Sequence, residues 1–283
     1  MPELPEVETI RLQLNRVLTG LKITDVKVLS QKNFIGRIGE LIDRKIISVN
    51  RRAKLILIEL DNGNYIAIHL KMTGQLIFKD IGEMGPCKIN CSRYDVSGMP
   101  NKYTRVILGF NKAKLYFNDL RKFGWMKIVT KLELKILNQD YGPEPFDKNF
   151  SNEYLKNTFS KTSKPIKIVL LDQEKIAGIG NIYANEALFK AGIIPTKPAK
   201  KLNNQEIDKL RKAIISILTE SIKRKGTSDK DEAYRQISGE KGQFQNYLKV
   251  YNRENEECSK GNGKIKKIKI GGRGTFYCPI CQK

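Results

Sequence analysis

The first eight residues bring together groups that could do covalent chemistry. They are Met-Pro-Glu-Leu-Pro-Glu-Val-Glu, and removal of Met1 would leave Pro2 with a secondary amine. A neutral amine attacks electrophilic sugar or aldehyde carbons and forms an iminium ion. An α-amino group titrates near pH ~8, so part of it is neutral at pH 7. Pro2 is therefore a candidate nucleophile, and the adjacent Glu3 is a candidate proton shuttle.

A helix is predicted to hold this amine in place. Pro5 suits the first turn of a helix, and the carboxylates of Glu6 and Glu8 suit the positive end of its dipole. Apolar residues then recur at helical spacing, at Val7, Ile10, Leu14 and Val17. This spacing predicts that the helix buries one face and fixes the N-terminus. Taken alone, the stretch also fits an ordinary proline-capped helix.

The charge of the chain indicates a polyanionic partner. Its 283 residues include 52 basic and 30 acidic side chains, a formal net charge of +22. Nucleic acid and anionic membrane surfaces are the usual partners of such a protein. No apolar run approaches the ~20 residues that span a bilayer, and no signal peptide precedes Pro2. We therefore expect a cytoplasmic protein that does not bind membranes.

Short strands dominate the first half of the sequence. Strand patterns cover residues 22–30, 45–60, 65–70, 75–78, 105–110, 114–118 and 125–129. Asp61-Asn62-Gly63-Asn64 predicts a hairpin turn, and residues 79–102 predict a long loop. Many short strands separated by turns predict a β-sandwich or barrel over residues 1–130.

The second half changes character. Tyr141-Gly142-Pro143-Glu144-Pro145 predicts a linker, and helical spacing follows over 151–224, with Asn203 or Asn204 as a helix cap. Residues 226–242 are polar and are expected to be mobile. The predicted domains are 1–132 with the N-terminal helix, a linker at 133–150, a helical domain at 151–242, and a β-hairpin unit at 243–283.

Five further stretches combine basic, glycine or cysteine residues. They are Arg51-Arg52-Ala53-Lys54, His69-Leu70-Lys71-Met72-Thr73-Gly74, Asn118-Asp119-Leu120-Arg121-Lys122-Phe123-Gly124, Ala177-Gly178-Ile179-Gly180-Asn181-Ile182-Tyr183-Ala184-Asn185-Glu186, and residues 250–282. Basic side chains at a strand end could grip phosphates, and glycines before a helix could bring amides close to an anion. Singly, each stretch also has a plain structural interpretation.

Together with the N-terminal residues, and in this order, the stretches resemble the formamidopyrimidine-DNA glycosylase family. The resemblance implies an α+β fold. It consists of an N-terminal antiparallel β-sandwich with a long N-terminal helix, a helix–two-turn–helix domain, and a zinc-finger-like β-hairpin. It also implies a monomer that excises oxidised purines from double-stranded DNA and then cleaves the strand by β- and δ-elimination. A location at the nucleoid follows.

The resemblance assigns roles residue by residue. It makes Pro2, Glu3 and Lys54 catalytic, with Glu6 and Glu186 as supporting carboxylates. An extruded base leaves a hole in the duplex that apolar and cationic side chains can fill. The matching residues for this wedge are Met72, Arg121 and Phe123, and those for DNA phosphates are Lys167, Asn181 and Arg273. The chain departs from the family pattern at Lys71, where glycine is usual, and at Leu120, where proline is usual.

The C-terminal stretch implies a zinc finger that lacks one ligand. Cys278 and Cys281 form an intact pair, but Cys258 is followed by Gly261 where the family has a second cysteine. Three thiolates do not complete a structural tetrahedral site. A fourth ligand could come from elsewhere, with Cys87 and Cys91 as remote candidates, or the hairpin could form without metal.

Two other functions stay open. A related endonuclease VIII-like enzyme would remove oxidised pyrimidines, although Leu4 stands where that branch usually has glycine. A non-catalytic protein that binds damaged DNA would fit the incomplete finger. Intact Pro2, Glu3 and Lys54 favour an enzyme.

Overall fold

The computed structural model describes residues 1–283 except 82–97, 229–233 and 262. The described residues form two compact units, and each unit is built from two stretches of chain. The first unit contains Met1–Gln139 and Arg224–Gln245, and the second contains Asp140–Lys223 and Asn246–Lys283. The predicted long loop at 79–102 lies mostly outside the described residues.

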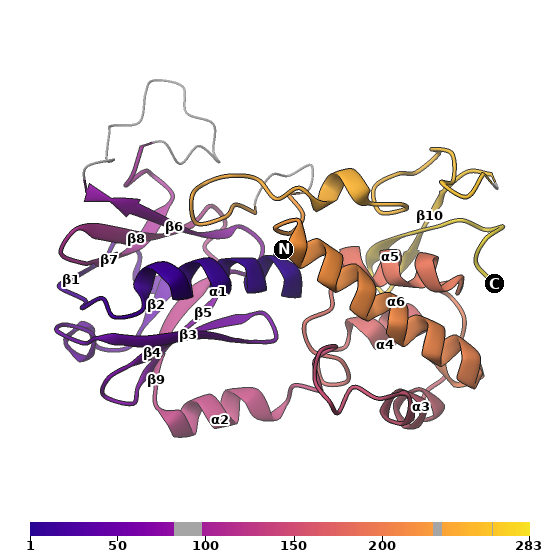
Figure 1. Ribbon diagram of the computed structural model, residues 1–283, viewed down its shortest axis with the longest axis horizontal. Coiled ribbons are helices and arrows are strands. Elements are labelled where there is room, and N and C mark those ends of the chain that lie inside the picture. The colour runs from indigo at the N-terminus through magenta and orange to yellow at the C-terminus, as the bar shows by residue number, and fades with distance from the viewer. Residues whose placement is uncertain (82–97, 229–233, 262) are drawn as a thin grey trace. The chain divides into compact units, whose positions relative to one another are not determined.

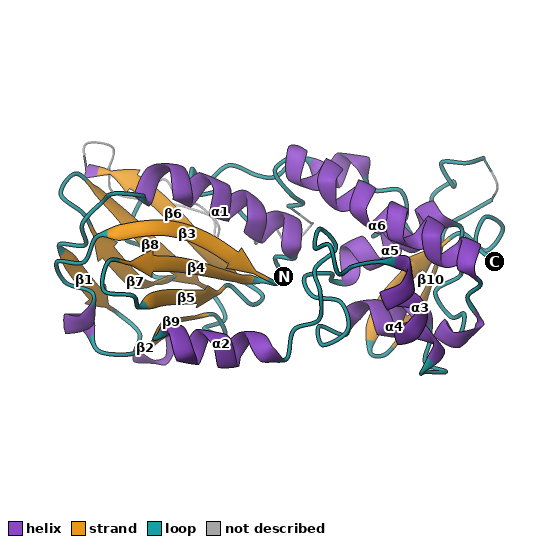
Figure 2. Ribbon diagram, turned by 60° about the horizontal axis from the view of Figure 1, so that its bottom comes forward, coloured by secondary structure: helices purple, strands orange, loops and turns teal. Residues whose placement is uncertain are grey.

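Two sheets form the body of the first unit (Figures 1 and 2). One has the order β2-β9-β5-β4-β3 and the other the order β1-β7-β8-β6. Their strands are β1 (Asp25–Val28), β2 (Phe34–Ile35), β3 (Ile46–Arg52), β4 (Leu55–Leu60), β5 (Tyr65–His69), β6 (Gly74–Asp80), β7 (Thr104–Gly109), β8 (Ala113–Asp119) and β9 (Trp125–Val129). All described pairings are antiparallel except that of β2 with β9. Apolar residues of both sheets share one core, so the predicted sandwich is confirmed.

Helix α1 (Leu4–Leu18) packs on this core, as its spacing predicted. Val7, Ile10 and Leu14 are buried in the core cluster, and Val17 packs against it. Asn15 fixes the helix to the sheet, because its side-chain oxygen accepts a hydrogen bond of 2.8 Å from the Val49 amide of β3. Both ribbon views place the N-terminus at the end of the unit where β3 turns into β4 (Figures 1 and 2).

Residues 224–245 return to the first unit and pack on α1 and β6. Gln13 of α1 donates to the Gln236 side chain (2.7 Å), and the Phe78 amide donates to the carbonyl of Ile237 (2.9 Å). Tyr234 and Ile237 are buried in the core cluster. Apolar side chains among the polar ones therefore pack the described parts of 226–242 against the first unit, and the mobility of this segment stays a prediction.

Helix α2 (Lys131–Gln139) was not predicted, since residues 133–150 were interpreted as a linker. Its start carries a capping box: Glu133 N donates to the Thr130 hydroxyl (3.2 Å), and Thr130 N donates to the Glu133 carboxylate (2.8 Å). Thr-x-x-Glu is the sequence signal for this cap, and it was overlooked. The helix buries none of its residues.

The second unit is helical and ends in a hairpin. Its helices are α3 (Asn152–Ser160), α4 (Ile166–Leu171), α5 (Asn181–Ala191) and α6 (Asn204–Lys223), and its strands are β10 (Lys266–Ile270) and β11 (Arg273–Tyr277). Asn203 caps α6, because the Glu206 amide donates to its side chain (2.9 Å). The predicted helical stretch and C-terminal hairpin are confirmed. Among the described residues, no helix combines the length and apolar character that crossing a bilayer requires.

Candidate active site

The candidate residues fall into two groups, one on each unit. Pro2, Glu3, Glu6, Lys54 and the three wedge residues lie on the first unit. Lys167, Asn181, Glu186 and Arg273 lie on the second, together with the three cysteines. We describe each group by itself.

A capping box fixes the residues that precede α1. Glu3 is the N-cap residue; its side chain accepts the Glu6 amide, and its own amide donates to the Glu6 carboxylate at 2.8 Å. Pro2, Glu3 and Glu6 are all buried. Two reciprocal hydrogen bonds in a buried setting leave this turn little freedom. The backbone of Glu3, which follows Pro2 directly, is therefore held in place at the start of α1.

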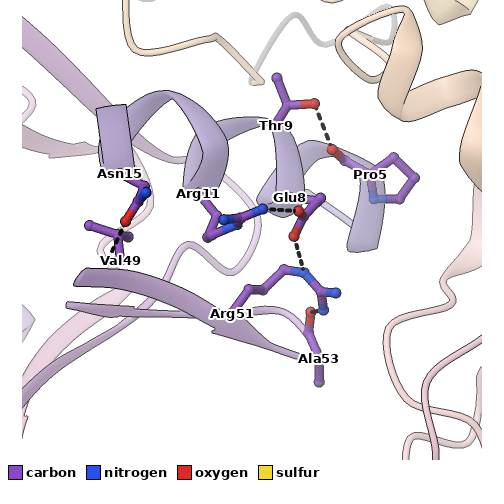
Figure 3. A network of polar contacts seen from close by, with 8 residues as sticks. All are labelled: Pro5, Glu8, Thr9, Arg11, Asn15, Val49, Arg51 and Ala53. Atoms are coloured by element: carbon purple, nitrogen blue, oxygen red, sulfur yellow. Dashed lines mark hydrogen bonds and ion pairs between the residues drawn. The ribbon is translucent and has the colours of Figure 1, made fainter. Parts of the chain in front are cut away.

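Arg51 connects this helix to the turn that carries Lys54 (Figure 3). Its Nε donates to Glu8 of α1 at 2.9 Å, and its Nη1 donates to the carbonyl of Ala53 at 2.8 Å. Its side chain is 9% exposed. The Arg51 side chain is therefore not available to bind phosphate, and it is not a solvated residue at the end of a strand. It holds the β3–β4 turn against the N-terminal helix.

Lys54 lies in the tight turn between β3 and β4. Arg52 pairs with Leu55, so Ala53 and Lys54 alone form the connection. Ala53 has a φ of 53°, a conformation that costs a residue with a Cβ about 1 kcal/mol. Lys54 is only 6% exposed, although it carries a charge. Strain and burial at one turn are typical of a functional site.

Glu6 also anchors the segment that begins at Gly226. Its Oε1 accepts the Thr227 amide at 2.8 Å, so its two oxygens serve two distant pieces of backbone. Gly226 has a φ of 77°, and a Cβ there would lie 2.9 Å from the Glu6 carboxylate. Only glycine fits this contact without displacement. Beyond it, the Ser228 hydroxyl donates to the carbonyl of Tyr234 at 2.9 Å, which joins the described ends on either side of residues 229–233.

The three wedge residues lie on two loops that Asp119 holds together. The fully buried Asp119 carboxylate accepts the Thr73 hydroxyl, the Arg121 amide at 3.1 Å and the Gly124 amide at 2.6 Å. Thr73 follows Met72, so this carboxylate connects the Met72 loop to the loop carrying Arg121 and Phe123. Thr73 keeps the hydroxyl that the usual serine would supply.

Phe123 projects a large apolar surface. It is 49% exposed, and the Arg121 guanidinium lies 4.8 Å from its ring centroid. Exposed aromatic and cationic groups on a rigid support suit insertion into a base stack.

Lys71 preserves the loop conformation that glycine would adopt. Its φ is 49°, and its amide donates to His69 Nδ1 at 2.9 Å. Burial, with the charges of Lys71 and Lys54, lowers the pKa of His69 to about 3. The imidazole is therefore neutral at pH 7, which leaves Nδ1 able to accept this hydrogen bond.

Asn181 begins α5 with a polar atom that has no partner. Its Oδ1 is buried and makes no hydrogen bond among the described residues. The two ends of an asparagine amide are interchangeable in a structure, so the turned side chain presents an NH₂ donor instead. A helix N-terminus also attracts anions. This arrangement suits an anion contact.

Lys167 is fully buried beneath the hairpin. Its ammonium donates to the Gly274 carbonyl (2.8 Å) and to the Thr275 hydroxyl (2.7 Å) of β11. This location favours a role in positioning the hairpin, and direct contact with phosphate stays a prediction. Arg273, the first residue of β11, is exposed and can reach a ligand.

Glu186 joins α5 to the chain that leads into the hairpin. It accepts the amides of Lys249, Val250 and Tyr251 at 2.8–2.9 Å and is 1% exposed. Burial raises its pKa despite these three hydrogen bonds. The carboxylate therefore organises the backbone of the second unit. Its supporting part in catalysis stays a prediction.

Cys258, Cys278 and Cys281 form a cluster. Their sulfur atoms all lie within 4.8 Å of one another, and Cys258 Sγ is 3.7 Å from Cys281 Sγ. Thiolates about 2.3 Å from a tetrahedral zinc ion would lie roughly 3.8 Å apart. The three cysteines therefore fit zinc in chemistry and spacing. Among the described residues they are the only cluster of metal-ligating type, and it offers three ligands. Cys87 and Cys91 lie outside the described residues.

Sequence reasoning missed several residues that hold the site together. Asp119 and Thr73 lay within motifs that were recognised, but their partners are distant in sequence. Arg51 was grouped with phosphate-binding residues, because nothing local pointed to Glu8. Polar residues inside a recognised motif, such as Thr73 and Asp119, are the sequence signal that could have pointed to these contacts.

Family descriptions match most of the chain. Residues 1–126 match the formamidopyrimidine-DNA glycosylase N-terminal domain, and residues 141–232 match the formamidopyrimidine-DNA glycosylase H2TH domain. Among curated proteins, the formamidopyrimidine-DNA glycosylase of Pelotomaculum thermopropionicum is 41% identical over 100% of this chain and 99% of its own length. That of Desulforamulus reducens is 39% identical with the same coverage.

Solved structures are similar over the same extent. MutM (Fpg) from Thermus thermophilus has a TM-score of 0.86 and 33% identity, and the match covers 99% of this chain and 98% of that one. Lactococcus lactis Fpg (MutM) in complex with a Fapy-dG-containing DNA has a TM-score of 0.86 and 32% identity, and covers 99% and 100%.

We expect Thr73→Val to lower the free energy of unfolding by about 1–2 kcal/mol, because the buried Asp119 carboxylate loses one of its hydrogen-bond donors. Thr73→Ser keeps the hydroxyl and should change stability by less than half of that. Urea denaturation of the two variants and the parent measures both values. Equal losses in the two variants would show that methyl packing, not the hydrogen bond, matters.

The chain has a single histidine, so its titration can be followed directly. The pKa of His69 in the folded protein is about 3, below the ordinary 6.5. Only the unfolded chain binds this proton between those values, so stability falls as the pH drops from 6.5 towards 3. The slope from this group is about 1.4 kcal/mol per pH unit.

NMR of the imidazole checks the midpoint, and denaturation at several pH values checks the slope. His69→Asn is the matched control, because its side-chain oxygen can accept the Lys71 amide without titrating. If the parent and this variant lose stability in parallel below pH 6.5, His69 is not the group responsible.

Proposed function

The chain belongs to the formamidopyrimidine-DNA glycosylase family, and from this we propose that it removes oxidised purines from duplex DNA and cleaves the strand at the resulting site. The substrate class covers 8-oxoguanine and formamidopyrimidines. Because its substrate is DNA, we propose that the protein acts in the cytoplasm, at the nucleoid. The observation that carries the proposal is the fixed arrangement of Pro2 and Glu3 at the start of α1.

The chemistry follows from the amine of Pro2. After removal of Met1, its nitrogen lone pair attacks C1′ of the damaged nucleotide, and the bond from C1′ to the base breaks. The electron pair and a proton leave with the base. Glu3 protonates the ring oxygen as the sugar opens, which gives an iminium ion between Pro2 and C1′. Loss of a proton from C2′ then expels the 3′ phosphate, and a second elimination expels the 5′ phosphate.

Residues of both units would bind the DNA. We propose that Lys54 contacts phosphate near the reacting sugar, where its burial strengthens electrostatic attraction. Met72, Arg121 and Phe123 would fill the gap left by the extruded base. Asn181 and Arg273 would hold phosphates from the second unit, and Lys167 would support the hairpin from which Arg273 projects.

Zinc would be held by Cys258, Cys278 and Cys281. When bound, it would stabilise the two turns of the hairpin and would take no part in the reaction. Because Lys167 and Asn185 also bind β11 directly, the hairpin does not rest on the metal alone.

Borohydride should trap a covalent adduct between the protein lacking Met1 and a duplex containing 8-oxoguanine. An N-terminal acetyl group should abolish the adduct, because an amide nitrogen is not a nucleophile. Glu3→Gln should reduce turnover by about 10²–10⁴-fold, the usual contribution of a proton-transferring group. Gel analysis of trapped and cleaved DNA measures both effects.

Lys54→Ala tests the role of Lys54. Its matched control is Lys45→Ala, which removes an exposed lysine at the other end of the same hairpin. Only Lys54→Ala should lower activity.

In the borohydride experiment, preferential trapping of the protein on a duplex with an oxidised pyrimidine would indicate the endonuclease VIII-like function. If unblocked protein binds both duplexes but forms no adduct, the chain is a binding protein and the proposed reaction is wrong.

We expect Arg273→Ala to weaken DNA binding and to reduce the slope of log Kd against log salt by about 1, since one phosphate contact is lost. Lys209→Ala removes the same charge from an exposed position on α6 and should leave the slope unchanged. Fluorescence anisotropy at four salt concentrations measures the slopes. Identical slopes for parent and Arg273→Ala would contradict the phosphate contact.

A further inference from the structure

The described backbone after Cys258 is hydrogen-bonded although this stretch lacks a second cysteine. Cys258 N donates to the Gly263 carbonyl at 2.8 Å, and Gly261 N donates to the Cys258 carbonyl at 2.8 Å. The opposite turn is closed as well, because Gln282 N donates to the Cys278 carbonyl at 3.1 Å. Backbone hydrogen bonds therefore close both described turns without a second cysteine beside Cys258.

The position of the missing ligand is open. Gly261 is exposed, and a Cβ built on it meets no described atom within 4 Å. No described side chain has moved into this space to replace the cysteine. Its φ of 74° is the left-handed conformation that favours glycine. A ligand from solution can therefore approach from the side of Gly261.

The hairpin stays in place without a closed metal site. The Phe276 amide donates to Asn185 of α5 at 2.9 Å, and Gln282 donates to the Ile193 carbonyl at 2.8 Å. The Gln282 side chain also accepts the Cys278 amide at 2.8 Å, which orients one of the ligands. The three sulfur atoms are therefore preorganised by protein contacts, and a fourth ligand can exchange without unfolding the unit.

Charge and chemistry select the fourth ligand. Three thiolates and one Zn²⁺ ion carry a net charge of −1. Exposed lysines flank the turn at 260 and 264, and Lys260 lies over the ring of Phe189, which packs in the same cluster as Cys258 and Cys278. These cations offset the charge of a fourth anionic ligand. Thiolates are the soft ligands that zinc accepts most readily beside other thiolates.

We propose that the metal ion held by Cys258, Cys278 and Cys281 keeps a fourth coordination position beside Gly261, and that this position binds a small thiolate from solution. The inference rests on the proposed zinc site. A proton leaves the incoming thiol and the sulfur lone pair forms the bond to the metal, which displaces any water there. No oxidation is involved. The finger would thereby respond to the concentration of small thiols.

Cobalt(II) in place of zinc tests the proposal on the full chain. Samples contain a phosphine reductant and no thiol, and 2-mercaptoethanol is then added in steps. The sulfur-to-cobalt charge-transfer absorption should rise by the contribution of one more thiolate. The apparent affinity for the metal should tighten by about tenfold for each tenfold rise in thiol above its own dissociation constant, as binding of one ligand requires.

Gly261→Cys is the matched variant, because it supplies the fourth thiolate from the chain. It should show the four-thiolate spectrum without added thiol and no response to it. Cys87→Ser with Cys91→Ser should behave as the parent does. If the parent's response appears only after this double substitution, the chain itself supplies the fourth ligand and the inference is wrong.

The outcomes separate the two claims. If the parent binds no cobalt at any thiol concentration while Gly261→Cys binds it, both the zinc site and the inference fail. If the parent binds cobalt but its spectrum and affinity ignore the thiol, the zinc site stands and the open position is wrong.

Discussion

The ion pair between Glu8 and Arg51 is the interaction on which the first unit's site depends. It joins the helix that begins just after Pro2 and Glu3 to β3, the strand that leads into the turn carrying Lys54, and the same guanidinium holds the Ala53 carbonyl (Figure 3). In the proposed reaction, Pro2 and Lys54 act on one nucleotide and must therefore lie at a fixed separation. Because Arg51 is largely withdrawn from solvent, this link is protected from the screening that weakens surface ion pairs.

Buried carboxylates repeat this arrangement elsewhere. Glu6 accepts amides from the N-terminal turn and from Thr227, Asp119 binds both wedge loops, and Glu186 accepts three consecutive amides before the hairpin. In each case a charged acceptor replaces the water that irregular backbone would otherwise need. Loops that carry functional residues are thereby held almost as firmly as regular elements.

The sequence predicted what local patterns encode. The apolar spacing of α1, the Asp61–Asn64 turn and the Asn203 cap all depend on residues within one or two turns of each other, and the structure confirms them. Arg51, Asp119 and the burial of Lys167 depend on partners 43, 46 and more than 100 residues away. From residue type alone, Arg51 and Lys167 were interpreted as phosphate-binding, and Asp119 was given no role. Only tertiary contacts distinguish a cation that holds the protein backbone in place from one that binds a ligand. The Thr130–Glu133 cap is local, so the start of α2 can be predicted from capping residues and not from hydrophobic spacing alone.

The bond between Ser228 and Tyr234 separates two tasks within one segment. Below it, Gly226 and Thr227 are committed to the carboxylate of Glu6, where steric fit leaves no room for variation. On the other side, the bond between Ser228 and Tyr234 closes the described ends of the segment on each other. The Ser228–Tyr234 bond therefore isolates the contacts that Gly226 and Thr227 make with α1 from the stretch of chain between 228 and 234.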